Sequence, residues 1–140
     1  MSSIQKSIRL PAETLREIEK IARDGGKDFS AITKDLLEEA IKMRRCPGIV
    51  FADGATGRRA RVLGTGIEVW EIIAAYQNLN RGFERLKKAY HWLTSEQLRS
   101  ALAYYAIYPK EIDNQISQNE SWDERKLQEH FPVLSLNSRN

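Results

Sequence analysis

The hydrophobic pattern of the first fifty residues changes its period once. From Ile4 to Leu10 apolar and polar positions alternate, as they do along a strand with one buried face. After Pro11 the apolar positions recur every three or four residues, which predicts a helix with one buried stripe. The members of this stripe are Leu15, Ile18, Ile21 and Ala22. The sequence therefore predicts a short strand followed directly by an amphipathic helix.

A second helix is expected after a glycine turn. Gly25 and Gly26 end the first helix, because glycine readily adopts the backbone of a helix C-terminus. Asp28 is a suitable N-cap for the next helix, since its carboxylate can accept hydrogen bonds from the first turn. The buried side of this second helix consists of Ile32, Leu36, Ala40 and Ile41. A strand and two short helices cannot bury a core alone, so this part of the chain needs a second copy of itself.

In such a dimer the lone strand would pair with the same strand of the second chain. The apolar side chains of Ile8 and Leu10 would then face the shared core. The side chains of Gln5, Ser7 and Arg9 would lie on the opposite, positively charged face of the ribbon. A two-stranded ribbon fits the major groove of DNA, where Arg can read guanine and Gln can read adenine. These three polar residues are therefore the predicted DNA-reading positions.

The start of the second helix offers a further contact with DNA. The backbone N–H groups of Phe29 and Ser30 lack partners inside the helix and would bind a phosphate on each flank of the ribbon. The stretch "KSIRLPAETLREIEKIARDGGKDFSAITKDLLEEAI" resembles the ribbon-helix-helix (CopG-like) family of bacterial repressors and antitoxins, over residues 4 to about 45. The resemblance implies a homodimer, formed through the Ile4–Leu10 strand and the helices after it, that binds operator DNA. The alternative is an ordinary helical hairpin with an unpaired leader.

Residues 46–116 predict a second domain made of a β-hairpin and helices. Two apolar runs, Ile49–Phe51 and Ala60–Leu63, flank a turn-rich stretch at residues 52–59 and predict the hairpin. Helices are expected after Gly66, over Arg81–Trp92, from a capping box at Thr94, and from Glu111 to about Asn119. Trp70 and Trp92 are expected among the aromatic side chains of the core.

The stretches "GTGIEVW", "YHWLTSEQLRSALAYYA" and "YPKEID" resemble a small domain, domain of unknown function 433. The resemblance implies a hairpin followed by a helix-turn-helix-like bundle. Gly64-Thr65-Gly66 is interpreted as a tight turn, because it lacks the further residues of a nucleotide-binding loop. In the helix after Thr94, Glu96 stands close to Arg99, a poor arrangement for binding DNA, so a scaffold or protein-binding role is favoured.

Arg58, Arg59 and Arg61 form the best basic cluster of the middle domain. They would contact flanking nucleic acid or remain solvated; the sequence favours neither.

Residues 117–140 are a polar tail with scattered apolar side chains. The ribbon-helix-helix unit followed by this domain resembles VapB-like antitoxins of type II toxin–antitoxin systems, whose partners are PIN-like ribonucleases. The resemblance implies a tail that folds on the toxin. The candidate toxin-binding residues are Trp122, Arg125, Lys126, Leu127 and Phe131. The tail would otherwise pack on its own dimer.

Composition and charge limit the class of protein to which the chain can belong. A net charge of +3 permits nucleic acid as a partner without requiring it. The single cysteine, Cys46, rules out an intramolecular disulfide and fits a reducing cytoplasm. No apolar run approaches the roughly 20 residues of a membrane helix, so no membrane association is expected. His91 and His130 are the only histidines and lack partners at catalytic or ligand spacing. We therefore expect no enzyme, no metal and no cofactor.

These patterns predict a mainly α fold in three parts. A ribbon-helix-helix domain occupies residues 1–45, a hairpin with a trihelical, helix-turn-helix-like domain occupies 46–116, and a tail occupies 117–140. The expected function is that of a cytoplasmic, homodimeric, DNA-binding antitoxin that neutralises a PIN-like ribonuclease and represses its own operon. One alternative is a stand-alone ribbon-helix-helix transcriptional regulator whose middle domain senses a ligand or oligomerises. Another is a protein-interaction scaffold whose ribbon never meets DNA.

Overall fold

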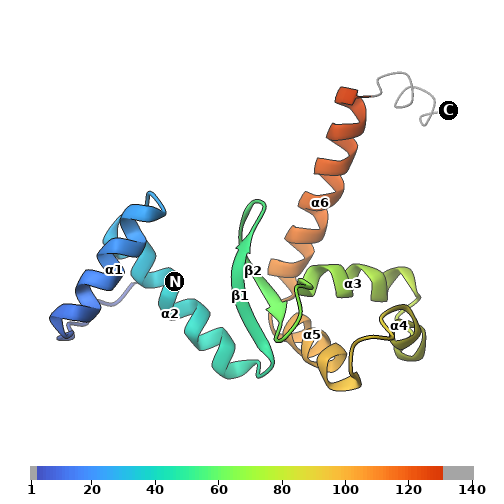
Figure 1. The fold of residues 1–140 in the computed structure, drawn as a ribbon, viewed down its shortest axis with the longest axis horizontal. Helices are drawn as coiled ribbons and strands as arrows, with labels where there is room; N and C mark the ends of the chain where they lie inside the picture. The colour runs from blue at the N-terminus through green and yellow to red at the C-terminus, as the bar shows by residue number, and fades with distance from the viewer. Residues whose placement is uncertain (1–2, 131–140) are drawn as a thin grey trace. The chain divides into compact units, whose positions relative to one another are not determined.

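The computed structural model of the chain describes residues 3–130, and the side chains of residues 3–121 (Figure 1). Within this part the protein is mainly helical, with six helices and one two-stranded antiparallel sheet. This confirms the mainly α class predicted from the sequence. The chain divides between Arg44 and Arg45 into an N-terminal unit and a C-terminal unit.

The N-terminal unit contains the two predicted helices, α1 (Ala12–Asp24) and α2 (Phe29–Arg45). Residues 3–11, which precede α1, form neither helix nor strand in the single chain. An intermolecular strand would need the second chain, so the ribbon stays a prediction. Asp28 precedes α2 and caps it, since its Oδ1 accepts the backbone N–H of Ala31 at 2.7 Å.

The turn after α1 has the geometry that the glycine pair predicted. Gly26 adopts a left-handed backbone, with φ of +64°. Its N–H donates to the carbonyl of Arg23 at 3.2 Å, and the N–H of Lys27 donates to the carbonyl of Ala22 at 2.9 Å. This pair of bonds is the Schellman arrangement, which satisfies carbonyl groups that the last helical turn leaves unpaired.

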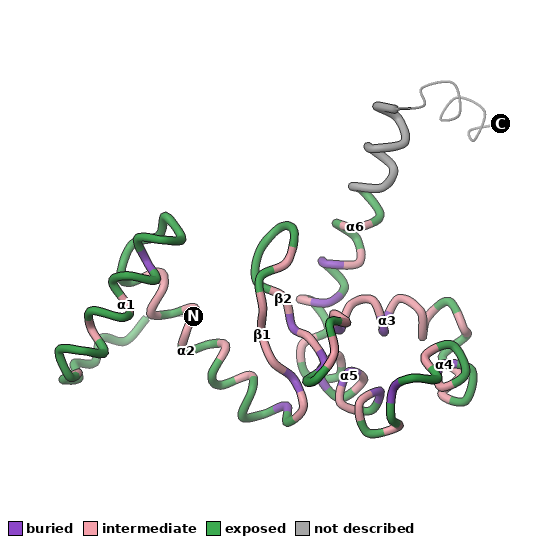
Figure 2. Tube along the Cα trace, in the orientation of Figure 1, coloured by how far each residue is buried: buried purple, intermediate pink, exposed green. Residues whose placement is uncertain are grey.

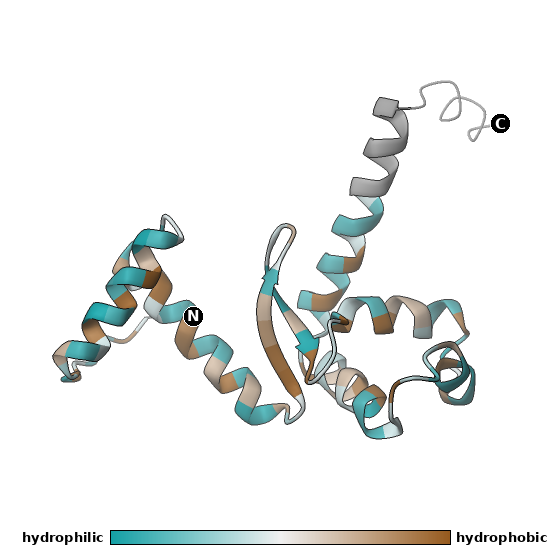
Figure 3. Cartoon of the chain, viewed as in Figure 1, coloured by the Kyte–Doolittle hydropathy of each residue, from teal (hydrophilic) through white to brown (hydrophobic). Residues whose placement is uncertain are grey.

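The N-terminal unit has almost no core of its own. Among its described side chains only that of Ala22 is buried (Figure 2). Ile8 is 73% exposed, and Leu37 is 57% exposed on α2. Apolar positions form separate bands along both helices, between polar ones (Figure 3). A unit of this size with its apolar side chains uncovered lacks the burial that a stable fold requires.

The C-terminal unit begins with an antiparallel hairpin of β1 (Ile49–Gly54) and β2 (Gly57–Val62). The predicted turn over residues 52–59 is too long, because Gly54 still pairs with Gly57 and only two residues connect the strands. Pairing satisfies the backbone groups of these residues, and Gly57, with φ of +136°, accommodates the tight connection.

Four helices follow the hairpin: α3 (Val69–Asn78), α4 (Phe83–Ala89), α5 (Ser95–Ile107) and α6 (Pro109–His130). The helix predicted over Arg81–Trp92 is wrong at both ends. Asn80 and Arg81 have φ near +55°, which a helix cannot include. Because α4 stops at Ala89, Trp92 falls in the next turn and is 60% exposed, so its predicted place in the core is also wrong.

The helix α6 is longer than the predicted helix from Glu111 to Asn119. It starts with Pro109, whose missing N–H is tolerated in the first helical turn. It then continues to His130 because no further proline or glycine interrupts it.

At the start of α5, the N–H of Gln97 donates to Thr94 Oγ1 at 3.1 Å, and the N–H of Thr94 donates to Gln97 Oε1 at 2.9 Å. The predicted capping box is therefore confirmed.

The core of the C-terminal unit lies where the hairpin meets α3, α5 and α6. Its fully buried side chains include Val62, Val69, Ile72, Ile73, Leu86, Leu98, Ala101, Tyr104 and Ile112. The hydroxyl of Tyr104 donates to Glu111, so the one polar group of that ring has a partner. Burial, and then the hydrogen bond to Glu111, raise the pKa of Tyr104, which keeps the phenol protonated.

Candidate nucleic-acid interface

The predicted DNA-reading residues lie in the segment before α1. Gln5, Ser7 and Arg9 are all exposed there. The residues between Ser3 and Pro11 include two cations, Lys6 and Arg9, and no acid, so the local potential is positive. In the single chain nothing except sequence proximity brings these side chains together. The geometry of a reading face would come from pairing with a second copy.

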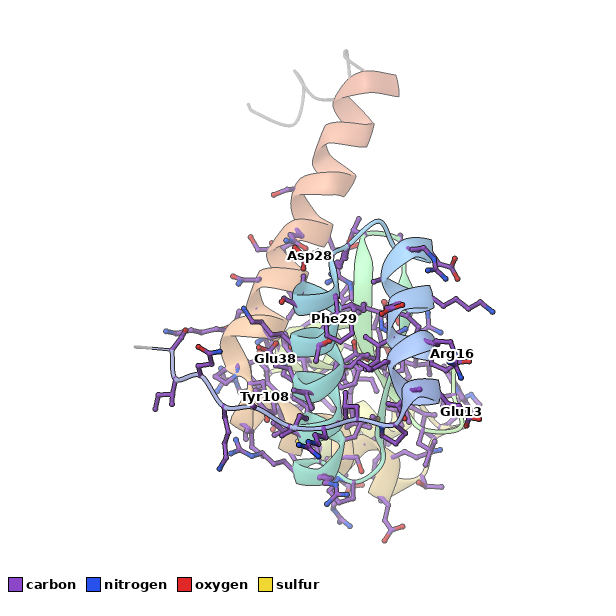
Figure 4. The ribbon with its side chains drawn as sticks, turned by 90° about the vertical axis from the view of Figure 1, so that its left-hand side faces the viewer. Glu13, Arg16, Asp28, Phe29, Glu38 and Tyr108 are labelled. Carbon is purple, nitrogen blue, oxygen red and sulfur yellow. The ribbon has the colours of Figure 1, made fainter. Side chains whose placement is uncertain are left out.

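The predicted phosphate clamp lies at the start of α2. Figure 4 shows Asp28 and Phe29 at this helix end, and Glu13 and Arg16 on α1. The carboxylate of Asp28 binds the N–H of Ala31, whereas the N–H groups of Phe29 and Ser30 have no partner among the described residues. Two free N–H groups at a helix N-terminus can bind an anion, although the charge of Asp28 opposes it.

Lys27, next to the start of α2, is already paired with a carboxylate. Lys27 Nζ lies 2.6 Å from Asp35 Oδ2 on the surface of α2. The hydrogen bond to Asp35, together with its negative charge, raises the pKa of Lys27. This ammonium therefore stays charged at neutral pH, but its charge is partly balanced by Asp35 before any phosphate arrives.

The arginines of the hairpin form hydrogen bonds and an ion pair with other residues of the C-terminal unit. Arg58 Nη1 lies 3.3 Å from Asp53 Oδ1, and Arg61 Nη2 donates to the carbonyl of Asp53 at 3.0 Å. The guanidinium of Arg59 donates to Thr56 Oγ1 and, at 3.4 Å, to Gln118 Oε1. These bonds hold the three guanidinium groups against the hairpin and α6, and they make this cluster a weaker candidate for nucleic acid than the N-terminal segment.

One cation of α5 also makes a contact inside the C-terminal unit. The guanidinium carbon of Arg99, on α5, lies 5.3 Å from the centre of the Phe83 ring on α4, within the range of a cation–π contact.

Residues 49–105 match the DUF433 family model. The family is described as a protein of unknown function, so the match fixes the type of this domain and says nothing of its partners. It confirms the resemblance that the "LTSEQLRSALAYYA" stretch suggested. The DUF433 segment ends inside α5 and leaves the N-terminal unit and α6 outside the match. No curated protein and no solved structure matches the chain.

The predicted toxin-binding residues follow the DUF433 segment. The backbone of Trp122, Arg125, Lys126 and Leu127 belongs to the last turns of α6, and their side chains lie outside the described part. Phe131 lies outside the described residues altogether.

Within residues 3–130, no helix has the length and apolar character to cross a bilayer. In the same part, no three His, Cys, Asp or Glu side chains gather as a metal site would require.

The fold also brings together a group of residues that no pattern in the sequence had indicated. A cavity of about 260 Å³ is lined by Ala55, Thr56, Arg59, Glu68, Trp70, Gln115, Gln118 and Asn119. These residues come from the tip of the hairpin, the start of α3 and the middle of α6. Only the fold joins three segments so far apart in the chain. The one local signal was the density of side-chain amides between positions 114 and 119, where four of the six residues are Asn114, Gln115, Gln118 and Asn119.

Proposed function

We propose that the protein is a homodimeric, DNA-binding antitoxin of a type II toxin–antitoxin system, which neutralises a PIN-like ribonuclease and represses its own operon. The observation that carries the DNA-binding half is the uncovered apolar side of the N-terminal unit, preceded by an alternating, basic segment. The antitoxin half rests on the resemblance of the ribbon-helix-helix unit and its following domain to known antitoxins.

A second copy of the chain is the partner that best fits the N-terminal unit. The exposed side chains of Ile8, Leu37 and Ile41 gain roughly 1.5–3 kcal/mol each when fully buried, and several such residues offset the loss of freedom on association. Two antiparallel copies of the segment before α1 would also pair backbone groups that residues 3–11 leave outside any helix or strand.

Pairing of the segment fixes the outward face of the ribbon. Because side chains alternate along a strand, burial of Ile8 directs Ser7 and Arg9 to the opposite surface. Each chain then contributes one Arg9 to a face that carries no acid between residues 3 and 11. An arginine there can donate two hydrogen bonds to the major-groove edge of guanine.

Replacing Arg9 by alanine is expected to weaken binding to the DNA upstream of the chain's own gene by about 1–3 kcal/mol per base contact. Fluorescence anisotropy at fixed salt, with the upstream fragment and a scrambled fragment, measures the change. Arg9→Lys keeps the charge but loses the two-pronged geometry, so it should bind scrambled DNA normally and the upstream DNA poorly.

The matched control is Arg16→Ala, which removes an exposed arginine from α1. It should leave the preference for the upstream DNA unchanged. Equal binding of the upstream fragment by the original chain and Arg9→Ala would contradict the reading role of Arg9. An equal loss on both fragments would reassign Arg9 to a phosphate contact and remove it from base recognition.

Co-expression with the product of the adjacent gene tests the antitoxin half. If that product is a PIN-like ribonuclease, the full chain should restore growth, because a bound antitoxin blocks the nuclease. A chain ending at Ser121 keeps every described side chain and removes the predicted toxin-binding residues, so it should fail to restore growth. Full rescue by the shortened chain would refute the tail as the toxin-binding segment, and no rescue by the full chain would refute the antitoxin assignment.

A second candidate function is that of a stand-alone regulator whose C-terminal unit senses a small molecule. The observation in its favour is the cavity between the hairpin, α3 and α6. A ligand-dependent change in DNA affinity, with no toxin encoded nearby, would favour this function over the antitoxin.

A further inference from the structure

We propose that Arg58 and Arg61 close the outer edge of the hairpin and thereby prevent the β1 strands of two chains from pairing with each other. Both arginines belong to the C-terminal unit, so this role does not depend on DNA binding or on a toxin. The register of the hairpin, two arginine bonds that cross β1 and the symmetry of the edge together indicate it.

The two edges of the hairpin differ in what covers them. At the edge of β2 the N–H of Val62 donates to the carbonyl of Ile67 at 3.0 Å, and Arg61 forms a β-bridge with Glu68. Among the described residues, no strand pairs with the other edge of β1. The sequence of β1, IVFADG, is mostly apolar. An open edge of this kind is a pairing site for a strand of another chain.

The register of the hairpin determines which backbone groups of β1 point to the open edge. The N–H of Leu63 donates to the carbonyl of Gly48 at 2.8 Å, so these two residues form a hydrogen-bonded pair. Hydrogen-bonded and non-hydrogen-bonded pairs alternate along an antiparallel ladder, and Phe51 and Asp53 therefore occupy non-hydrogen-bonded positions. Their backbone N–H and C=O groups consequently point away from β2 and toward the open edge.

Two arginines of β2 reach across β1 to these carbonyl groups. Arg58 Nη2 donates to the carbonyl of Phe51 at 3.3 Å, and Arg61 Nη2 donates to the carbonyl of Asp53 at 3.0 Å. Neighbouring strands lie about 4.7–4.9 Å apart, a distance that an extended arginine side chain spans. Because Arg58 and Arg61 are three positions apart on one strand, they lie on opposite faces of the hairpin. One guanidinium therefore passes over each face of β1 to the same edge.

Further features of the two side chains fit this role. Arg58 Nη1 also lies 3.3 Å from Asp53 Oδ1, so a second contact holds its guanidinium beside β1. Arg61 Nε is buried and has no hydrogen-bond partner among the described residues. A buried donor without a partner opposes folding, so Arg61 is not explained by the stability of the hairpin alone. Its bond to the edge carbonyl of Asp53 supplies another reason for an arginine at this position.

Without the arginines, the edge would be complementary to a second copy of itself. If two β1 strands pair antiparallel about Ala52, Phe51 of each chain lies opposite Asp53 of the other chain. These residues then form two hydrogen-bonded pairs, and each pair exchanges both of its backbone bonds. Every one of these bonds uses the carbonyl of Phe51 or Asp53 as its acceptor. A guanidinium bonded to each carbonyl therefore occupies the place of the second strand.

Ala52→Cys provides a trap for this pairing, because cysteines opposite each other at the centre of the paired strands lie close enough for a disulfide. The one native cysteine, Cys46, is buried and should not compete. Glutamine is too short to cross β1, so Arg58→Gln combined with Arg61→Gln should open the edge. In the full chain this pair of substitutions should accelerate the interchain disulfide at least about tenfold, since donors that compete for the carbonyls are lost. Non-reducing electrophoresis during mild oxidation measures the rate.

The matched control combines Arg59→Gln with Lys88→Gln. It removes the same amount of charge, but it leaves both edge bonds in place. Arg59 lies on β2 between the two edge arginines and donates to Thr56 and Gln118 instead, and Lys88 is exposed on α4. With Ala52→Cys, the control should form the disulfide as slowly as the chain that keeps all its arginines.

All these chains keep the same N-terminal unit, so the comparison holds whether or not the proposed dimer forms. Equal rates of disulfide formation in the double variant and the control would overturn the proposal. Near-ultraviolet circular dichroism shows whether the double variant is folded. If it is not, Arg58→Gln alone decides the question, because the side chain of Arg58 is 46% exposed and its loss should leave the fold intact. This single variant should accelerate the disulfide to a smaller extent, and no acceleration would equally overturn the proposal.

Discussion

Replacing Ile8 by aspartate is expected to dissociate the dimer, whereas replacing its neighbour Ser7 by aspartate is not. In the single chain both side chains are exposed, Ile8 to 73%, so neither substitution removes a buried contact within that chain. In the proposed ribbon Ile8 faces the shared core. Its loss removes roughly 1.5–3 kcal/mol of apolar burial per chain, and the buried charge adds a larger penalty. Sedimentation equilibrium should show Ile8→Asp as a monomer or as an unfolded chain.

Ser7→Asp is the matched control, because it introduces the same charge one position away. It should remain a dimer and lose DNA binding, since it places two carboxylates on the face that meets the phosphates. If Ile8→Asp sediments as a stable dimer, the ribbon is not the interface. If both variants dissociate, the alternation of buried and outward positions between residues 4 and 10 is wrong.

Replacing Leu98 by alanine is expected to destabilise the C-terminal unit by about 2–5 kcal/mol. Leu98 lies on α5 and is fully buried in the core between the hairpin, α3 and α6. The substitution removes apolar contacts and leaves a cavity that a densely packed core fills only in part. Urea unfolding, followed by near-ultraviolet circular dichroism, measures the loss.

Leu63→Ala is the control for this substitution, because it makes the same exchange in the same unit at a side chain that is 57% exposed. Its effect should stay within about 0.5 kcal/mol. Similar losses for the two variants would show that Leu98 does not occupy the core that the structure assigns to it.

Features set by short-range physics could be predicted from the sequence. The cap at Asp28, the capping box at Thr94 and the left-handed turn at Gly26 each depend on residues within four positions. Val69, Ile72 and Ile73 recur at helical spacing along α3, and all three are buried. Local hydrogen bonds and periodicity decide these features before any tertiary contact forms.

The remaining differences come from contacts that no local pattern records. The hairpin continues to Gly54 because pairing across the strands satisfies backbone groups there, although the composition of residues 52–59 indicated a loop. Trp92 is exposed because α4 ends early, while its apolar character alone predicted burial. The cavity joins Arg59, Glu68 and Gln115 from three separate elements, so no spacing in the sequence announces it.

The uninterrupted course of α6 has a geometric consequence. At a rise of about 1.5 Å per residue, the twelve positions from Gln115 to Leu127 correspond to roughly 18 Å of a single rod. The end of α6 therefore has a fixed reach and a fixed angle relative to the hairpin tip. One inserted residue between Gln118 and Trp122 would turn everything beyond it by about 100° while lengthening the rod only slightly. Binding of a partner to the end of α6 therefore depends more on which way that end is rotated about the helix axis than on how far it extends.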